Sequence, residues 1–260
     1  MSVPRALPWQ ARLMLGLVPP ALLLAWWQSQ AQAGGARAAV FASLATIGVA
    51  AREQIASGAL LGDATATLTR ALTGFGIGGT LGFAAGVLLA LSRWAERLLG
   101  PLLQAFRQVP MIGWLPLFAL WFGTGDGSQV TVIAVSAFFP ALLNTHAGIV
   151  QVERRFLDVG RIYRLRAVQR FRLILLPGAL PLVLTGLTQA LSFAWIAAIG
   201  TEILLGSGGG LGVTLQTAQT EQRLDAMLVT IAVTAALGFA LNQIIRHLRA
   251  RLLHWQPVGA

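Results

Sequence analysis

The sequence predicts an all-α membrane protein that crosses the bilayer about six times, and two observations lead to this fold class. First, 56% of its 260 residues are hydrophobic and only 11% are charged, whereas a soluble domain carries about 25% charged residues. Second, apolar runs close to the ~20 residues that a helix needs to cross a bilayer recur along the chain. These runs are continuous rather than alternating, which argues against a transmembrane β-barrel.

The N-terminal part is predicted to form one transmembrane helix, in residues 1–34, and then an amphipathic outer segment, residues 35–70. The first apolar run contains Pro19 and Pro20, which should kink a helix. A cleaved secretory signal is the alternative, because the run is short and the sequence Ala-Gln-Ala at 31–33 matches a cleavage site. Residues 35–70 lack a run long enough to span, so we expect two short helices on the outer face.

Residues 71–256 are predicted to contain the remaining five transmembrane helices. We expect them at about 71–91, 110–122, 130–150, 180–205 and 226–245, with an interfacial helix at 92–110 on the inside. The first of these helices has glycine at every fourth position, from Gly74 to Gly86. Such a strip lets another helix approach closely, either within the same chain or in a second subunit.

An arginine-rich loop, residues 151–177, separates two of the apolar runs and contains seven arginines. An arginine at the bilayer centre costs ~3 kcal/mol, so seven would cost on the order of 20 kcal/mol and this segment cannot cross. All 19 basic residues are arginine, and six crossings place 15 of them on one side. The positive-inside rule makes that side the cytoplasm and places both termini there.

Composition excludes several kinds of chemistry. The chain has no cysteine, and its three histidines are far apart, so we expect neither a metal site nor any other cofactor. It also lacks lysine, so the glycine-rich run 206–210 cannot be a phosphate-binding P-loop, and the chain cannot itself be a P-loop ATPase. The net charge of +10 follows membrane topology rather than a nucleic-acid interface.

One motif in the arginine-rich loop connects the chain to a known family. Asp158-Val159-Gly160 is followed by Ile174 and Pro177. This spacing resembles the motif E-A-A-x-x-x-G-x(9)-I-x-x-P of permease subunits of binding-protein-dependent ABC importers. Arg164 stands where the motif has a glycine that lets the loop turn between two short helices. Other segments resemble the subgroup that imports aliphatic sulfonates, taurine and nitrate: 107–110, 115–117, 120–123, 138–140, 143–145, 175–181 and 208–212.

The resemblance covers about residues 60–256 and implies a type I ABC importer permease in the bacterial inner membrane. It implies three protein partners: a cytoplasmic ATP-binding subunit, a periplasmic substrate-binding protein and a second permease subunit, which we expect to be identical. The implied function is to form the path for a small anionic solute such as an alkanesulfonate, taurine or nitrate. An ion-coupled secondary transporter is the alternative, but it would need ionisable groups within the spans. An intramembrane serine protease built on Ser207 is disfavoured, because the preceding glycine of its motif is missing.

The residues of the loop predict how it would act. Over 154–166 the pattern predicts a short amphipathic helix, on which Phe156, Val159 and Tyr163 form an apolar stripe. Such a helix suits a groove on a partner protein, although basic residues also attract anionic lipid headgroups. We expect Asp158 to make polar contacts or to cap the helix. With the resemblance, the residues expected to couple the loop to the ATPase are Phe156, Asp158, Val159, Gly160, Tyr163, Arg164, Ile174 and Pro177.

Polar residues elsewhere give weaker candidates. The resemblance implies that the third to fifth spans line the path, where Asn144, Thr188 and Ser192 are candidate pathway residues; hydrogen bonding between helices is their alternative role. On the outer face, Asp126, Glu202 and Glu221 are candidates for docking the binding protein through complementary charge, or are simply solvated. The glycine-rich run 206–210 is expected to be a flexible outer loop.

Overall fold

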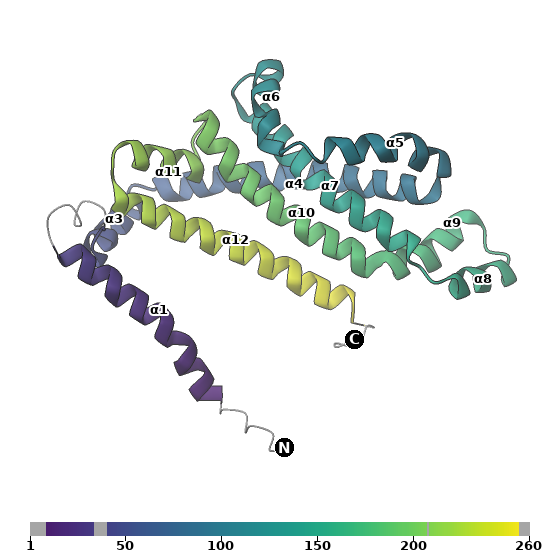
Figure 1. Ribbon diagram of the computed structural model, residues 1–260, viewed down its shortest axis with the longest axis horizontal. Helices are drawn as coiled ribbons and strands as arrows, with labels where there is room; N and C mark the ends of the chain where they lie inside the picture. Colours follow the sequence, from purple (N-terminus) through teal and green to yellow (C-terminus); the bar gives the residue numbers. More distant parts are fainter. Residues whose placement is uncertain (1–8, 34–40, 207, 255–260) are drawn as a thin grey trace.

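The computed structural model describes residues 9–33, 41–206 and 208–254, and all the regular elements in these ranges are helices. Four long helices run roughly along the longest axis of the molecule (Figure 1). They are α4 (Ala59–Leu91), α7 (Asp126–Val150), α10 (Leu176–Leu205) and α12 (Leu224–Leu252). With a rise of 1.5 Å per residue, a helix of 25 to 33 residues is about 38–50 Å long, which exceeds the ~30 Å hydrocarbon core.

Within the described ranges, four segments are long and apolar enough to cross a membrane: Ala59–Leu91, Asp126–Val150, Ala167–Leu205 and Leu224–Leu252. Two of the six predicted spans are not among them. The predicted span at 110–122 is a 3₁₀ helix, η1 (Met111–Trp114), followed by the eight-residue α6 (Leu115–Phe122). Proline at 110 and 116 breaks the run, so this region is too short to span as one straight helix.

The other exception is α1 (Trp9–Gln32), which contains the first apolar run. Figure 1 shows α1 diverging from the four long helices. Its C-terminal end is attached to the segment that leads into α3 (Leu44–Ala56), where Trp27 Nε1 donates to the carbonyl of Ala42 at 2.9 Å. The cleavage-site alternative falls partly outside the described residues.

The helix α4 corrects the expected boundary at residue 70. We predicted a short helix that ends before Arg70 and a span that starts after it, but one helix continues from Ala59 to Leu91. No proline interrupts this stretch, and the charge of Arg70 is neutralised by partners described below. The only feature of the sequence that suggested a helix end here was therefore the charge of Arg70, and tertiary contacts neutralise it.

The glycine strip of α4 packs against α7 of the same chain. A Cβ added to Gly78 would lie 2.0 Å from the carbonyl oxygen of Ala134, and one added to Gly82 would lie 2.3 Å from that of Phe138. Backbones this close leave no room for any side chain, so each glycine is required where it stands. Of the two predicted uses of the strip, packing within one subunit is the one confirmed.

The arginine-rich loop is shorter than predicted. It contains α8 (Arg154–Ile162), and the chain becomes helical again at α9 (Ala167–Arg170). A π-helical turn, η2 (Phe171–Leu175), then leads directly into α10, so residues 167–205 form one continuous helix. The expected start of the fifth span at 180 is therefore wrong. The π-turn shifts the hydrogen-bond pairing just before Pro177, where the amide of Leu176 donates to the carbonyl of Phe171, so the helix continues through a residue that has no N–H to donate.

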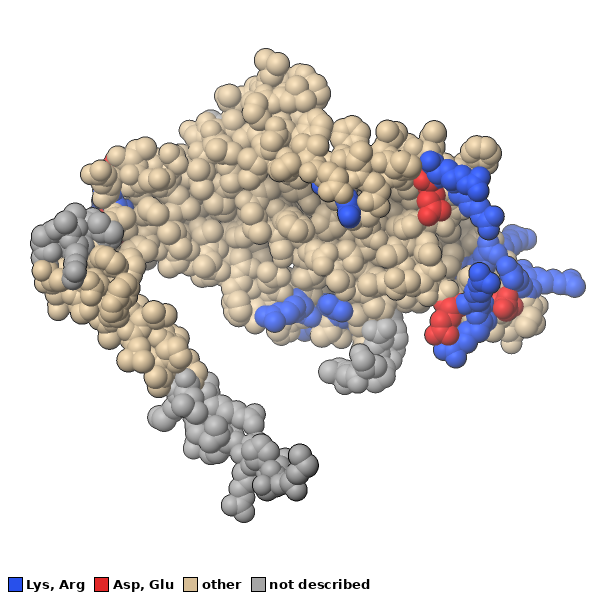
Figure 2. Space-filling view, viewed as in Figure 1, with Lys and Arg blue, Asp and Glu red and all other residues tan. Residues whose placement is uncertain are grey.

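Charged side chains are concentrated at one end of the molecule. Figure 2 shows arginines and a few carboxylates around α8 and α9, a further basic group near the C-terminal end of α12, and a largely uncharged middle. The opposite end carries α3 and α11 (Leu211–Thr220) (Figure 1). By the positive-inside rule we call the arginine-rich end the inner end and the opposite one the outer end.

Candidate functional site

The helix α8 presents the predicted apolar stripe to solvent. Phe156 and Val159 are 48% and 47% exposed, and Tyr163, at the C-cap, is 75% exposed. Ile162 is 78% exposed beside them, a fourth apolar residue that sequence analysis did not include. The opposite side of α8 faces the protein through Leu157, which packs against the buried cluster at the base of α10. Four exposed apolar side chains on nine helical residues and their cap form an unfilled contact surface.

Two residues of the recognised motif, Gly160 and Ile174, lie against each other. Gly160 is buried, and a Cβ placed on it would lie 2.7 Å from Cδ1 of Ile174. This contact joins α8 to the π-helical turn at the base of α10. A small residue at 160 therefore sets how closely α8 approaches the membrane-spanning helix.

The arginine that replaces the motif glycine adopts the glycine's conformation. Arg164 has φ of +50°, in the left-handed region that L-residues rarely occupy. The amide of Leu165 donates to the carbonyl of Gly160 at 3.0 Å, and the amide of Arg164 donates to the carbonyl of Arg161 at 3.0 Å. These two bonds form a Schellman helix ending. The turn is thus preserved without its glycine, at a cost of about 1–2 kcal/mol for the left-handed residue.

Asp158 has a different role from the one expected at a helix end. It accepts a hydrogen bond at 2.8 Å from Arg161 one turn along α8, and both side chains are more than half exposed. The N-cap of α8 is Glu153, whose side chain makes no capping bond. The capping role predicted for Asp158 is therefore wrong, while its expected polar contact is present. Pro177 is exposed on the side of the continuous helix.

The outer end contains a buried ionic network that centres on Arg70. The Arg70 side chain is 6% exposed, and its Nη1 donates to Oε1 of Glu202 at 2.8 Å. Its Nε donates to Oδ1 of Asp126 at 2.7 Å. The same guanidinium donates to the carbonyls of Gly208 and Gly209 at 2.8 and 2.7 Å. One arginine of α4 thereby joins α7, α10 and the glycine-rich run 206–210.

The same network holds the start of α11. Three backbone amides that begin this helix donate to side chains: Gly210 to Asp63 at 3.0 Å, Leu211 to Thr67 at 2.9 Å, and Gly212 to Glu202 at 2.9 Å. These are groups that a helix cannot satisfy internally. We name this set the outer network: Asp63, Thr67, Arg70, Asp126, Glu202 and residues 208–212.

Two expectations about the outer end are corrected by this geometry. Glu202 is 0% exposed, so it is neither solvated nor available on the surface to dock a binding protein. The described glycines of the run 206–210 are held by hydrogen bonds rather than free, and Ser207 lies outside the described residues. The reason is that an arginine and a glutamate placed far apart in sequence neutralise each other only in the folded chain.

The other two acidic docking candidates are on the surface. The Asp126 side chain is 70% exposed although it pairs with Arg70, and Glu221 is exposed at the end of α11. Near Glu221, Arg223 lies 3.4 Å from both Glu53 and Asp225. The hydrogen bond to Asp225 raises the pKa of Arg223 above its usual value. This part of the outer face therefore carries both signs of charge.

The three candidate pathway residues do not share one surface. Asn144 lines a groove of about 580 Å³ between α7 and α10, which we call the α7–α10 groove. Its Nδ2 donates to the carbonyl of Pro140 at 2.9 Å and to Oε1 of Gln189 at 3.1 Å. Thr188 and Ser192 instead bond within α10, to the carbonyls of Leu184 and Thr188.

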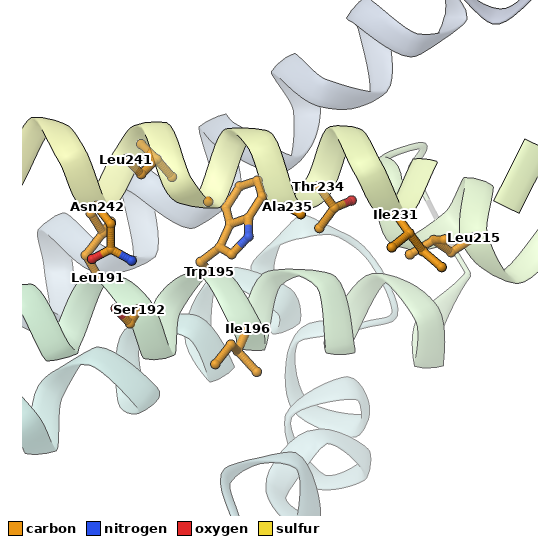
Figure 3. Close-up of a pocket in the computed structure, with 11 residues that line it drawn as sticks. Leu191, Ser192, Trp195, Ile196, Leu215, Ile231, Thr234, Ala235, Leu241 and Asn242 are labelled. Carbon is orange, nitrogen blue, oxygen red and sulfur yellow. The ribbon is translucent and has the colours of Figure 1, made fainter. Parts of the chain in front are cut away.

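Ser192 lines a different cavity, of about 400 Å³, between α10 and α12. Figure 3 shows Trp195 extending from α10 toward α12 in this space. A Cβ on Gly238 of α12 would lie 2.8 Å from the indole Nε1, so the glycine makes room for the ring. Ser192 therefore lies on the side of α10 that faces α12, away from the α7–α10 groove, and Thr188 lines neither of the two cavities.

Sequence analysis assigned no site role to Arg70 or Arg107, and it grouped Gln189 loosely with Thr188 and Ser192 on one face of the fifth span, whereas Gln189 lines the α7–α10 groove and Ser192 does not. A lone arginine and a lone glutamate at the ends of apolar helices were a usable signal, because charges in membrane helices tend to pair. For Arg107 no such signal exists, and the face of α10 to which Gln189 belongs could not be assigned, since only the packing of α7 on α10 shows which side of each helix faces the groove.

Comparison with known proteins identifies the family of the chain. Residues 78–254 match the model of the binding-protein-dependent transport system inner membrane component. The chain belongs to this family of ABC importer permeases. It is 35% identical over 243 residues to the putative aliphatic sulfonates transport permease protein SsuC of Bacillus subtilis, with 94% of this chain and 88% of the relative covered. It is 32% identical over 238 residues to the protein of the same name from Escherichia coli, with 92% and 90% covered.

A solved structure agrees on the fold. A chain from inward-facing conformations of the MetNI methionine ABC transporter matches with a TM-score of 0.63 at 18% identity, covering 74% of this permease and 96% of that chain. The fold is therefore that of type I importer permeases. The permease is a multi-pass inner-membrane protein without an ATPase site, and transport by its family requires an ATPase subunit and a binding protein.

Proposed function

We propose that this permease forms, as a homodimer, the membrane pathway of an ATP-driven importer for a small anionic solute such as an alkanesulfonate, taurine or nitrate. The support for the solute class is that two relatives at 32% and 35% identity carry the name of aliphatic sulfonate permeases. The support for a dimer is that α1 leaves the long helices and exposes apolar residues such as Leu17, Leu22 and Leu23 at 64% or more. In this proposal both chain termini are cytoplasmic.

The exposed stripe of α8 carries the proposed coupling to the ATPase. Phe156, Val159, Ile162 and Tyr163 lie on a short helix that contacts the base of α10 through Gly160 and Ile174. A movement of α8 would therefore be transmitted to a helix that continues through the membrane to Leu205. Binding of the stripe in a groove of the ATPase subunit gives that movement its source.

Docking of the binding protein is proposed for the acidic outer surface, at Asp126 and Glu221. Both are exposed, and they lie at the end opposite the arginine-rich loop. Complementary charge would orient the binding protein and speed its association more than it would tighten the complex. Glu202 has no part in this surface because it is buried.

The proposal is tested by reconstitution of the permease with its ATPase subunit and binding protein in proteoliposomes. ATP-dependent accumulation of ethanesulfonate, taurine or nitrate is expected, and it should disappear when the ATPase subunit is omitted. Accumulation without nucleotide and without the ATPase subunit would support a secondary transporter instead. Lack of uptake of all three solutes by a complete, ATP-hydrolysing complex would remove the proposed solute class.

The coupling step has its own test. Phe156→Ala with Tyr163→Ala is expected to reduce co-purification of the ATPase subunit in detergent, where bilayer headgroups are absent. Arg246→Ala, a substitution at another basic position near the inner end, serves as the control. If the loop only attracts anionic lipid, the double variant will co-purify normally, and docking through the stripe is then rejected.

A further inference from the structure

The α7–α10 groove differs chemically along its length. Near the inner end it is lined by polar side chains, Arg107, Gln108, Asn144 and Gln189. Toward the outer end the lining is mostly apolar and includes Phe139, Phe193, Ile112 and Ile196; the hydroxyl of Ser136, also at this end, donates to the carbonyl of Val132 within α7. The direction is set by the two helices, because α7 runs inward from Asp126 and α10 runs outward from Leu176. Ile112 marks the outer limit, since it lies 3.5 Å from a Cβ placed on Gly200.

The polar end offers hydrogen-bond donors that the protein does not use. The Asn144 amide donates a hydrogen bond to Oε1 of Gln189. The orientation of the Gln189 amide is thereby set, and its Nε2 remains as a hydrogen-bond donor. Within the described parts of the chain, that Nε2 has no acceptor and the Arg107 guanidinium has no ion-pair partner. None of the residues that line the groove is acidic. A guanidinium and an amide N–H without acceptors, beside an apolar wall, suit an anion that carries an apolar group.

We propose that the α7–α10 groove is a binding subsite for a short-chain alkanesulfonate. The sulfonate oxygens accept hydrogen bonds from Arg107 and from Nε2 of Gln189, and the alkyl chain lies against Phe139 and Phe193. This inference rests on the proposed function and adds the place in the membrane where the solute is held. The groove volume of about 580 Å³ lies within the range of small-molecule sites and exceeds the need of a bare inorganic anion.

The cavity between α10 and α12 provides an internal comparison. It has no arginine in its lining, and its polar contribution is limited to Ser192, Thr234, Asn242 and the edge of Trp195. A lipid acyl chain would fit the mostly apolar wall of this cavity, but an acyl chain has no group that could pair with Arg107 in the α7–α10 groove. The anion is therefore expected in one cavity and not in the other.

The absence of cysteine from the sequence allows a direct test. Leu143→Cys would place a single thiol of the permease in the groove, at a lining position to which no contact with the sulfonate or its alkyl chain is assigned. Ser192→Cys would place one in the cavity between α10 and α12. Both variants would be studied as the permease–ATPase complex in nanodiscs, without nucleotide. The thiol reagent is 2-sulfonatoethyl methanethiosulfonate, which carries a sulfonate, and its rate of reaction with the permease would be followed by mass spectrometry.

Ethanesulfonate should slow modification of Leu143→Cys in a saturable manner, about tenfold at ten times its half-protecting concentration, and leave that of Ser192→Cys unchanged. Ethanol should protect neither. No protection of Leu143→Cys, or equal protection by ethanol, would overturn the proposal. Rapid disulfide formation between two permease copies that carry Leu143→Cys would show that a second subunit fills the groove, and this too would overturn the proposal. Val109→Cys, also in the groove, replaces Leu143→Cys if the latter does not assemble.

Uptake by the full reconstituted transporter separates this inference from the proposed function. Arg107→Gln should lower ethanesulfonate uptake about tenfold at subsaturating solute, as expected for loss of one charge-assisted hydrogen bond. Arg97→Gln, on the helix α5 (Arg93–Phe106) whose C-cap is Arg107 but outside the groove, should transport normally. If the unaltered transporter takes up ethanesulfonate and Arg107→Gln equals it, the subsite is wrong and the function stands. If the unaltered transporter takes up neither ethanesulfonate nor taurine nor nitrate, the proposed solute class fails.

Discussion

The two ends of this permease use arginine in opposite ways. At the outer end, Arg70 is 6% exposed and is held by two carboxylates and two backbone carbonyls. At the inner end, Arg161 is 72% exposed and pairs with a single carboxylate of its own helix, Asp158. A buried arginine whose hydrogen bonds all go to groups of the same chain has a structural role. An exposed arginine beside an uncovered apolar stripe remains available to lipid or to a partner.

The difference follows from desolvation. Removing one member of a buried ion pair leaves a charge without water or partner, which costs about 3–5 kcal/mol. An exposed pair contributes about 0–1 kcal/mol, because water and salt replace the lost partner. Substitution of a single charged residue at the outer end is therefore expected to destabilise the fold. Substitutions at the inner end should change the stability little but should weaken assembly with the ATPase subunit.

The largest expected effect is at Arg70. Arg70→Ala leaves Glu202 fully buried without its cation and frees the carbonyls of Gly208 and Gly209, so we expect destabilisation by about 3–5 kcal/mol. Thermal unfolding of the purified permease in detergent, together with its yield from membranes, measures this. Arg223→Ala is the matched control, because Arg223 also has two carboxylate partners but is 48% exposed. Equal losses in the two variants would remove the distinction between the ends.

A packing change at the inner end should have an intermediate effect. Gly160→Leu forces a large side chain against Ile174, and overpacking of this kind costs about 1–3 kcal/mol. Gly160→Ala should be milder, since only the flexible end of Ile174 must move. Loss of ATPase co-purification with Gly160→Leu, and its retention with Gly160→Ala, are the expected readouts. If the leucine variant binds the ATPase normally, the approach of α8 to α10 is not needed for assembly.

Restoring the motif glycine should stabilise the turn after α8. Arg164→Gly relieves the left-handed conformation and is expected to stabilise the turn by up to about 1 kcal/mol. Hydrogen–deuterium exchange of the α8 amides would then be slower. Arg166→Gly provides the control, because Arg166 has φ of −65° and gains nothing from glycine. Faster exchange in Arg164→Gly than in the unaltered chain would contradict this account of the turn.

The smallest effect is expected for the exposed ion pair of α8. Arg161→Ala removes the contact to Asp158, and we expect the unfolding free energy to change by no more than about 0.5 kcal/mol. The same thermal assay that is used for Arg70 applies here. A loss above about 2 kcal/mol would show that the inner end depends on its ion pairs as the outer end does.

Much of the membrane architecture could be predicted from local composition. The spans at 130–150 and 226–245 lie within α7 and α12, and the position of the amphipathic helix α8 followed from its apolar period. The close packing of the glycine strip was also predicted, because residues four apart share one helix face. What failed were boundaries: the start of α4, the start of the helix that contains Pro177, and the short region at 110–122.

By itself, the sequence determined that the chain is a helical membrane protein with an arginine-rich loop between two of its spans, because these properties depend on local hydrophobicity and charge. Only the tertiary structure decided that Glu202 is buried against Arg70, that Asn144 and Gln189 share a groove, and that Ser192 faces another helix. The physical reason is that these relationships join residues 45 to 132 positions apart, and no local pattern records which faces of two helices will meet.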